Sequence, residues 1–347
     1  MATPRWELTV EARAHSDMLP LSRWGDDDAA EALSARGGQR GRNLAYIDNE
    51  IRVSRGSPMG TGPGRISLLA RQSATLVASR GAVELAADAQ TAGRPPADRR
   101  WDVHARYLAF AGSGLAWQHG VSPAADWQLQ GGVQALVLRD WRERLIDGTA
   151  GYTAADGRYT ANLSSFEASD RLLFPYQQAF GGHGSALLFD AELRWAGERF
   201  SAGLGVRDAG RLRWRGLPQN ESRLNTNTRS VDPNGFVLYQ PLVEGRNTQP
   251  RRQRAAPLRV QTFVAWQADA ATRLELAAEH VTHFGLLPRF GVEHALGAWR
   301  IGAGWHVYER RATASVGWRG LQLRVGVDAF GGRMRSRELA LAGSWPL

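Results

Sequence analysis

The stretch that decides the fold is GLQLRVGVDAF, residues 320–330. Its odd-numbered residues from Leu321 to Ala329 are apolar, and the residues between them are Gln322, Arg324, Gly326 and Asp328. A period of two indicates a β-strand, because successive side chains point to opposite faces. Such a strand suits a soluble sandwich, with its apolar face on a core. It equally suits a membrane barrel, with its apolar face toward lipid and its polar face toward a lumen.

The same alternation recurs along most of the chain, whereas helical periodicity is nearly absent. The best helix candidate is residues 26–38, which we expect to form a short helix within a loop. The alternating segments include residues 6–14, 127–137, 186–195, 258–266, 274–281 and 299–307.

The connections between these segments distinguish the two environments. Short connections alternate with long polar ones, which lie at about 16–40, 80–100, 168–183 and 215–255. Trp residues stand at strand ends beside the short connections, and Trp prefers a membrane interface, where its ring is apolar and its N–H is wet. A soluble sandwich offers no reason for this asymmetry, so we predict a membrane barrel. We expect one belt at the periplasmic interface, formed by Trp195, Trp266, Trp299, Trp318 and Trp345.

The strand count follows from the same pattern. We predict an all-β, antiparallel, up-and-down barrel of about 16 strands, with short periplasmic turns and long extracellular loops. Without a hairpin at 143–168 the count is 14, and either even number places both termini on the periplasmic side. Residues 80–92 are expected to lengthen a strand beyond the membrane. The last strand, ELALAGSWPL, alternates up to Trp345.

The amino-acid composition limits the classes of protein to which the chain can belong. The 347 residues carry a formal net charge of +9, and all 43 basic residues are Arg. These arginines are dispersed through strands, so nucleic-acid binding is not predicted. Mean hydropathy is −0.37, and no run approaches the roughly 20 apolar residues of a membrane-spanning helix. There is no Cys, which removes disulfides and Cys-type zinc sites. The N-terminus has no leader pattern, so we expect that a signal peptide has been removed.

The alternation, the unequal connections and the Trp positions together resemble Gram-negative outer-membrane β-barrel proteins as a class. The resemblance covers nearly the whole of residues 1–347, as a single domain, and rests on architecture instead of a family motif. It implies a location in the bacterial outer membrane, with lipid and lipopolysaccharide around the barrel. Polysaccharide-export barrels share the 16-strand size and an Arg-containing lumen.

The lumen face predicted from the alternation carries both charges. One interpretation is a network of salt bridges that stiffens the wall, and the other is a pore whose charges select solutes. The predicted pore-lining arginines are Arg13, Arg52, Arg71, Arg106, Arg194, Arg207, Arg259, Arg273, Arg300 and Arg324. The predicted inward carboxylates are Glu11, Asp48, Glu50, Asp190, Glu192, Glu275, Glu279, Glu293 and Asp328.

The long 215–255 connection is polar and rich in turn residues. Its length exceeds that of an ordinary connection, so it could constrict the pore, cover the mouth or contact a partner. If it folds inward, Arg251, Arg252 and Arg254 form a basic pore loop. The loop at 168–183 holds exposed apolar residues, which indicates a lid or a docking patch.

Three functions remain open. The leading one is an outer-membrane channel, porin-like, that passes polar and preferentially anionic solutes or a secreted polymer. The second is a plugged structural or assembly barrel that binds a partner protein through its long loops. The third is an outer-membrane enzyme, but no spacing of Ser, His and Asp singles out a catalytic group, so we expect none. No metal or cofactor site is predicted, since His280 and His283 alone are a weak signal.

The register of residues 320–330 can be tested directly. Val325→Arg should impair insertion or stability, because Arg at the middle of the hydrocarbon costs roughly 2–4 kcal/mol. Arg324→Ala should be tolerated, because this side chain faces the lumen. Folding into lipid vesicles, followed by heat-modifiable migration on a gel, measures both. Equal tolerance of the two substitutions would contradict the register.

Overall fold

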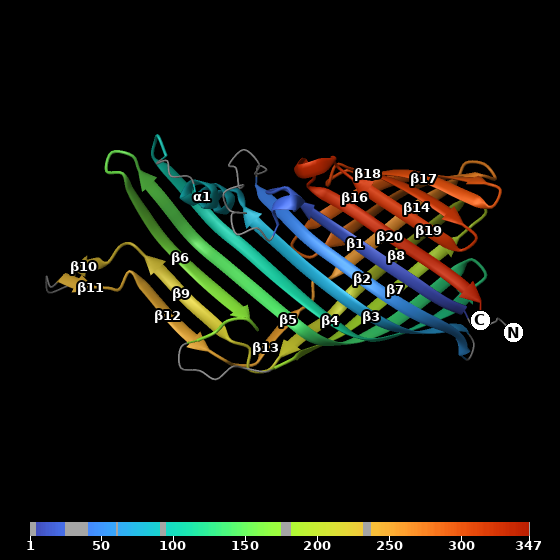
Figure 1. Ribbon diagram of the computed structural model, residues 1–347, viewed down its shortest axis with the longest axis horizontal. Helices are drawn as coiled ribbons and strands as arrows, with labels where there is room; N and C mark the ends of the chain where they lie inside the picture. Colours follow the sequence, from blue (N-terminus) through green and yellow to red (C-terminus); the bar gives the residue numbers. More distant parts are fainter. Residues whose placement is uncertain are drawn as a thin grey trace.

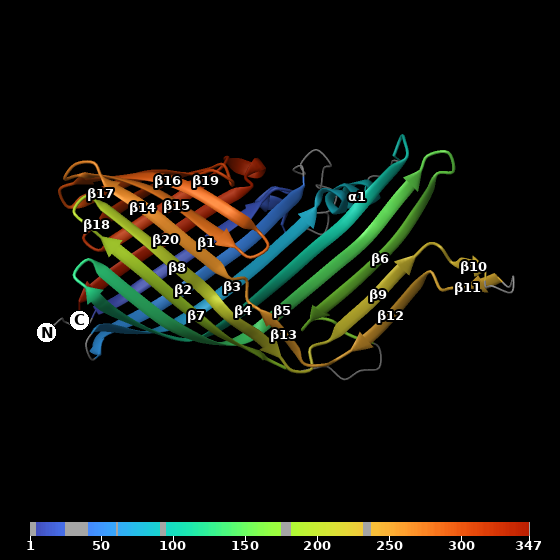
Figure 2. The same cartoon turned by 180° about the vertical axis from the view of Figure 1, so that it is seen from behind.

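The wall of the molecule is one antiparallel sheet that closes on itself, seen from two sides in Figures 1 and 2. The structure is a computed structural model that describes residues 5–24, 41–59, 62–90, 95–174, 182–231 and 237–346. Within these ranges the closed barrel has 14 strands, and the last one pairs with the first. In order around the barrel they are β1 (Arg5–Ser16), β2 (Arg42–Met59), β3 (Gly62–Ser79), β4 (Arg99–Ala124), β5 (Trp127–Thr153), β7 (Gly184–Ala196), β8 (Phe200–Trp214), β14 (Arg259–Gln267), β15 (Thr272–Val281), β16 (Gly285–Leu296), β17 (Trp299–His306), β18 (Arg311–Trp318), β19 (Leu321–Val327) and β20 (Ser336–Pro346).

The two ends of the barrel differ. One end, here called the turn end, carries both chain termini and the short turns (Figure 1), such as those at 125–126 and 297–298. Arg319 and Gly320 adopt positive φ values of 44° and 89° in the turn between β18 and β19, a conformation that glycine adopts without strain. The opposite end, here called the loop end, carries the long connections. The predicted even strand number and the common side of the termini are confirmed.

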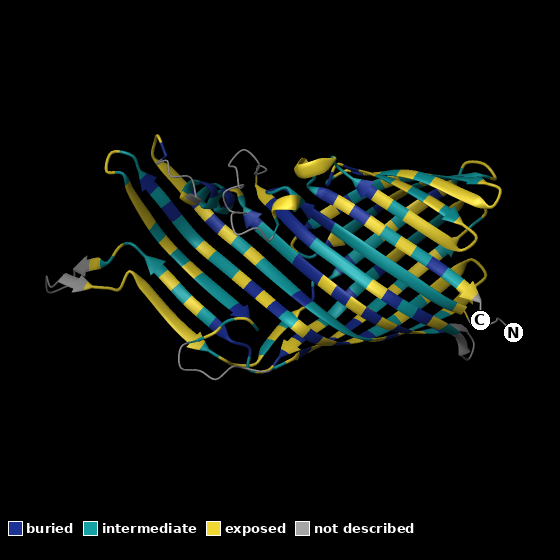
Figure 3. Ribbon diagram, viewed as in Figure 1, coloured by how far each residue is buried: buried dark blue, intermediate teal, exposed yellow. Residues whose placement is uncertain are grey.

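The strand pairing assigns every side chain to a face. Arg324 pairs with Ser315 on one side and with Ala340 on the other, and directly paired residues share a face. Its neighbours Leu323 and Val325 point outward and are exposed. Exposed and buried residues alternate along the strands in Figure 3. The outward apolar band includes Ile51, Leu68, Leu115, Leu187, Leu204, Val264, Leu276, Phe290, Ile301, Leu323 and Leu341.

The predicted break between two strands near residue 142 was wrong. Residues 127–153 form the single strand β5, in which a bulge at residues 139–140 shifts the inward positions from Leu136 and Leu138 to Trp141 and Glu143. β5 pairs with β7 as far as Leu138 and then with β6 (Arg158–Ser169) from Arg142 onward. β6 therefore lies outside the barrel, and the lower of the two predicted counts holds.

Of residues 80–92, which were predicted to lengthen a strand, the structure describes residues 80–90, and these do not lengthen one. They form the helix α1 (Arg80–Gln90). The Ser79 hydroxyl accepts a hydrogen bond from the N–H of Ala82, which is the interaction that begins a helix. Val83 and Ala87, four residues apart, are both buried, as expected for one face of a helix. The helix candidate at 26–38 lies outside the described residues.

The second half of β5 continues beyond the barrel as part of an open sheet. This outer sheet consists of residues 142–153, β6, β9 (Gln219–Asn225) and β12 (Val243–Thr248), and Figure 2 shows it reaching away from the loop end. α1 covers its outward face, where Ala82 and Leu85 pack near Trp101 and Tyr152. The remaining elements are β13 (Arg252–Ala255), which pairs with β8, the hairpin of β10 (Arg229–Val231) with β11 (Val237–Tyr239), and the short 3-10 helices η1 (Leu21–Arg23) and η2 (Gly331–Arg333).

An apolar cluster forms the junction between barrel and outer sheet. Trp141 and Trp214 pack there with Leu138, Leu188 and Leu212, all almost fully buried. The cluster occupies the inner face of the wall at the point where β5 changes its pairing partner. Within the described part of the chain, no helix is long and apolar enough to span a membrane.

Trp141→Ala should lower the free energy of unfolding by about 3–5 kcal/mol, because it empties a fully buried site. Trp318→Ala, at a 40% exposed position, is the matched control and should cost much less. Urea unfolding in detergent measures both. Equal losses would mean that the junction cluster contributes no more than the barrel surface.

Candidate pore and its ion-pair layer

Most of the predicted pore-lining residues share the inner face of the barrel. Pairing runs continuously around the wall, for example from Arg13 to Asp48 and from Glu275 to Gly291. The predicted residues on this face are Arg13, Arg52, Arg71, Arg194, Arg207, Arg259, Arg273, Arg300, Arg324, Asp190, Glu192 and Glu275.

Two predicted residues have other surroundings. Arg106 lies near the loop end of β4 and donates to a ring nitrogen of His283 at 2.8 Å. Asp328 lies between β19 and β20 and accepts the backbone N–H groups of Arg335 and Ser336, at 3.0 and 2.8 Å. It holds a connection in place and does not line the pore.

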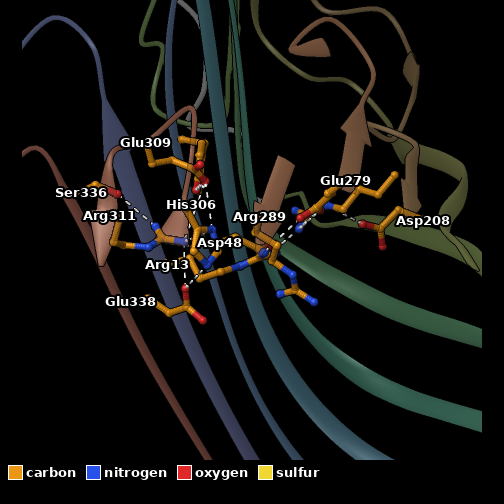
Figure 4. Close-up of polar contacts among 12 residues, drawn as sticks. Arg13, Asp48, Asp208, Glu279, Arg289, His306, Glu309, Arg311, Ser336 and Glu338 are labelled. Atoms are coloured by element: carbon orange, nitrogen blue, oxygen red, sulfur yellow. Dashed lines mark hydrogen bonds and ion pairs between the residues drawn. The ribbon is translucent and has the colours of Figure 1, made fainter. Parts of the chain in front are cut away.

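Six charged side chains meet in the middle of the lumen. The Arg71 Nη2 of β3 donates to the Asp208 Oδ2 of β8 at 2.7 Å. The Arg259 Nη1 of β14 donates to the Asp48 Oδ2 of β2 at 2.6 Å. Neither pair joins neighbouring strands, so both reach across the lumen. We call this set the ion-pair layer, and it consists of Arg13, Asp48, Arg71, Asp208, Arg259 and Glu279. Figure 4 labels its members Arg13, Asp48, Asp208 and Glu279.

Asp48 is the centre of the ion-pair layer. Its Oδ2 accepts from Arg13 at 3.0 Å and from Arg259 at 2.6 Å, and Arg71 Nη2 lies 3.6 Å from its Oδ1. The side chains of Arg71 and Arg259 are 2% and 7% exposed. Charges this buried are costly unless they are paired, and each of these guanidinium groups has a carboxylate partner.

A second buried cluster lies beside the ion-pair layer (Figure 4). Arg311 donates to Glu338 Oε2 at 2.8 Å and to the Ser336 hydroxyl at 3.0 Å. Glu309 lies in the turn after β17. Burial raises its pKa, but the nearby His306 and the Arg311 charge outweigh burial and lower it to about 2. Glu309 therefore stays ionised throughout the physiological range.

The ion-pair layer separates two cavities. Toward the turn end lies a vestibule of about 360 Å³, lined by charged residues such as Glu192, Arg194 and Arg273. Toward the loop end lies a cavity of about 20 Å³, lined by Asp48 and Arg259 of the layer on one side and by apolar residues such as Phe284 on the other. Arg13 and Glu279 line both. The layer is thus the narrow point of the described lumen.

The predicted pore loop lies elsewhere. The 215–255 connection contributes strands to the outer sheet and to the barrel rim. Arg252 and Arg254 belong to β13 and both bind the buried Glu143, with Arg252 Nη2 donating to its Oε1 at 2.8 Å. Arg251 is exposed. The constriction is instead formed by wall side chains, because β13 hydrogen-bonds to β8 and does not fold inward. Part of the 168–183 loop lies outside the described residues.

All five predicted belt tryptophans lie at the turn end. Trp299 pairs with Trp318 across neighbouring strands, and their rings stack with centroids 5.8 Å apart. Trp345 pairs with Trp6, while Trp195 and Trp266 stand at the turn ends of β7 and β14. The five residues therefore surround one rim of the barrel.

Sequence reasoning missed several members of these clusters. Asp208 has a φ of 64° and sits beside a bulge between β7 and β8, which shifts the alternation by one residue. The sequence signal for this bulge was the Asp-Ala-Gly run at residues 208–210, which interrupts the alternation of the strand. Glu143, Arg311 and Glu338 were also missed, because their partners come from distant strands. Among the described residues, no group of three or more His, Asp or Glu could hold a metal ion.

Comparison with known proteins finds distant structural likenesses with TM-scores below 0.5. The sequence matches no protein-family profile and no curated protein. The P. putida toluene transporter TodX is 8% identical, aligns over 100% of this chain and 91% of its own, and has a TM-score of 0.46. A Pseudomonas aeruginosa FadL homologue is 11% identical, aligns over 100% of this chain and 91% of its own, and has a TM-score of 0.45. A mutant Rh. blastica porin is 8% identical, aligns over 99% of this chain and 100% of its own, and has a TM-score of 0.28.

These values are too low to carry an argument about function. The closed antiparallel β-barrel predicted from the sequence is confirmed by the strand pairing itself.

The Arg71–Asp208 pair can be tested by a double-mutant comparison. Asp208→Ala should destabilise the barrel by about 3–5 kcal/mol, because it leaves a buried guanidinium with less than its full set of partners. The double variant Arg71→Met/Asp208→Leu should recover part of this loss, since apolar packing often replaces a buried pair. Urea unfolding in detergent measures both. A double variant less stable than Asp208→Ala would contradict the pairing.

Proposed function

We propose that the protein is an outer-membrane channel for polar solutes, with a modest preference for anions, and that the ion-pair layer holds it closed. The observation that carries this proposal is the layer itself, which crosses the lumen between two cavities. In the proposed orientation the turn end faces the periplasm, the belt tryptophans mark the inner interface, and lipid and lipopolysaccharide surround the apolar band.

The nature of the closure favours a channel over a permanent plug. The layer is made of wall side chains such as Arg71 and Arg259, and side chains change rotamer far faster than a folded plug leaves a barrel. A charged solute offers alternative partners to these groups. Weak binding at several charged positions then lets the solute enter and leave.

The anion preference rests on the balance of charges. The ion-pair layer is neutral, with three arginines and three carboxylates. At the rim, Arg252 and Arg254 share the single carboxylate of Glu143, which leaves an excess positive charge. Guanidinium groups also match carboxylate and phosphate geometry. The preference should weaken in high salt, as the screening length falls to about 3 Å at 1 M.

A partner-binding barrel is the second candidate, favoured by the outer sheet. β12 pairs with β9 alone among the described strands, so its other edge is free. Val243 of β12 is 59% exposed, and Tyr239 of the preceding strand β11 is 72% exposed. Exposed strand edges can pair with an extended segment of another protein. Neither candidate assigns a catalytic role or a cofactor.

Conductance in planar bilayers distinguishes the two candidates. Wild type should open rarely, whereas Arg259→Ala should conduct more, because it removes contacts to both Asp48 and Asp208. Arg144→Ala is the matched control. It also removes an arginine with a carboxylate partner, Glu167, but this pair lies in the outer sheet and not in the ion-pair layer. Reversal potentials in a salt gradient should indicate a preference for anions.

Two outcomes would contradict this proposal. If neither wild type nor Arg259→Ala conducts, the partner-binding barrel is the better account. A cation preference in the openings of the wild type would leave the channel but reject the anionic solutes.

A further inference from the structure

We propose that Asp48 occupies an anion-binding site, in which a carboxylate or phosphate group of the passing solute replaces the Asp48 side chain among Arg13, Arg71 and Arg259. The inference rests on the proposed channel and names the ligand chemistry of its narrowest point.

The geometry resembles a receptor already filled by an internal anion. Arg13, Arg71 and Arg259 come from β1, β3 and β14, and they approach one carboxylate from three parts of the wall. Planar guanidinium groups that converge on one point form the usual recognition site for carboxylate and phosphate oxygens. The Asp48 side chain is 12% exposed, so its removal would leave a space lined by these groups.

Asp48 does not use all the donors around it. Arg13 Nε and Arg259 Nε are buried and make no hydrogen bond, although Arg259 Nε lies 3.3 Å from Asp208 Oδ2. The Asp48 Oδ1 atom also makes no hydrogen bond, with Arg71 Nη2 at 3.6 Å. Buried donors usually have partners. A tetrahedral phosphate, with more oxygens than a carboxylate, could accept from more of these N–H groups.

A solute can reach this site from the vestibule. Arg13 lines the vestibule, as do Arg207 and Arg273. Six arginines and six glutamates of the described chain line the vestibule, so an anion meets guanidinium partners there without a net positive field, and Arg13 lines both the vestibule and the small cavity beside Asp48. The path therefore leads an anion to one of the three arginines around Asp48.

The test asks whether an added anion replaces the missing carboxylate of Asp48→Ala. Thermal unfolding of the purified variant in detergent is followed in sodium phosphate and in sodium chloride of equal ionic strength. The unfolding midpoint should rise with phosphate concentration and saturate, because a ligand that binds only the folded state stabilises it. Wild type should shift less, since Asp48 already fills the site. Asp140→Ala is the matched control, because it removes an exposed carboxylate with a single arginine partner, Arg171.

Equal midpoint shifts in wild type, Asp48→Ala and Asp140→Ala would overturn the inference. If Asp48→Ala does not survive purification, refolding yields in the two salts answer the same question. A higher yield in phosphate supports the site, and equal or zero yields in both salts reject it.

Conductance of the same variant separates this inference from the proposed function. Phosphate stabilisation without conductance would keep the anion site and reject the channel. Conductance of Asp48→Ala without any difference between phosphate and chloride would keep the channel and reject the site.

Discussion

The contact of one carboxylate with three guanidinium groups holds the centre of this barrel together. Asp48 brings together Arg13, Arg71 and Arg259 from separate parts of the wall. Each of these charges is buried and would be costly alone, so the opposite walls must stay close enough for the pairs to form. The same contacts lie between a charged vestibule and a small cavity of mixed lining. The closed state and the shape of the lumen thus depend on one electrostatic constraint.

Much of the barrel was predictable, because lipid penalises charge on one face of every strand. That penalty makes the alternation of residues 320–330 readable as an outward and an inward face, and the pairing of Arg324 with Ser315 and Ala340 agrees. The strand count was harder to predict. A bulge at residues 139–140 shifts the inward positions by one residue within a single long strand. The sequence pattern therefore resembles that of two shorter strands, and only the pairing reveals the difference.

The pairing inside the lumen could not be predicted from the sequence. Alternation identifies Arg71 and Arg259 as inward residues but carries no information about which distant strand each one faces. Asp208 was hidden for a different reason, since a bulge and a positive φ move it out of the regular alternation. The strands within the 215–255 connection could not be predicted either. They are short, and they form hydrogen bonds with β6 and β8 as well as with each other.

Closure of the lumen by the ion-pair layer is the central claim, and cysteine labelling tests it most directly. The chain has no Cys, so a single Ser315→Cys on the inner face of β18, beside Gly302 and Arg324, gives a clean reporter on the turn side of the layer. A charged, membrane-impermeant thiol reagent added outside intact cells should leave this cysteine unlabelled. The same reagent should label it once Asp48→Ala is added. Labelling of Ser315→Cys from outside at the same rate without the second substitution would contradict the account.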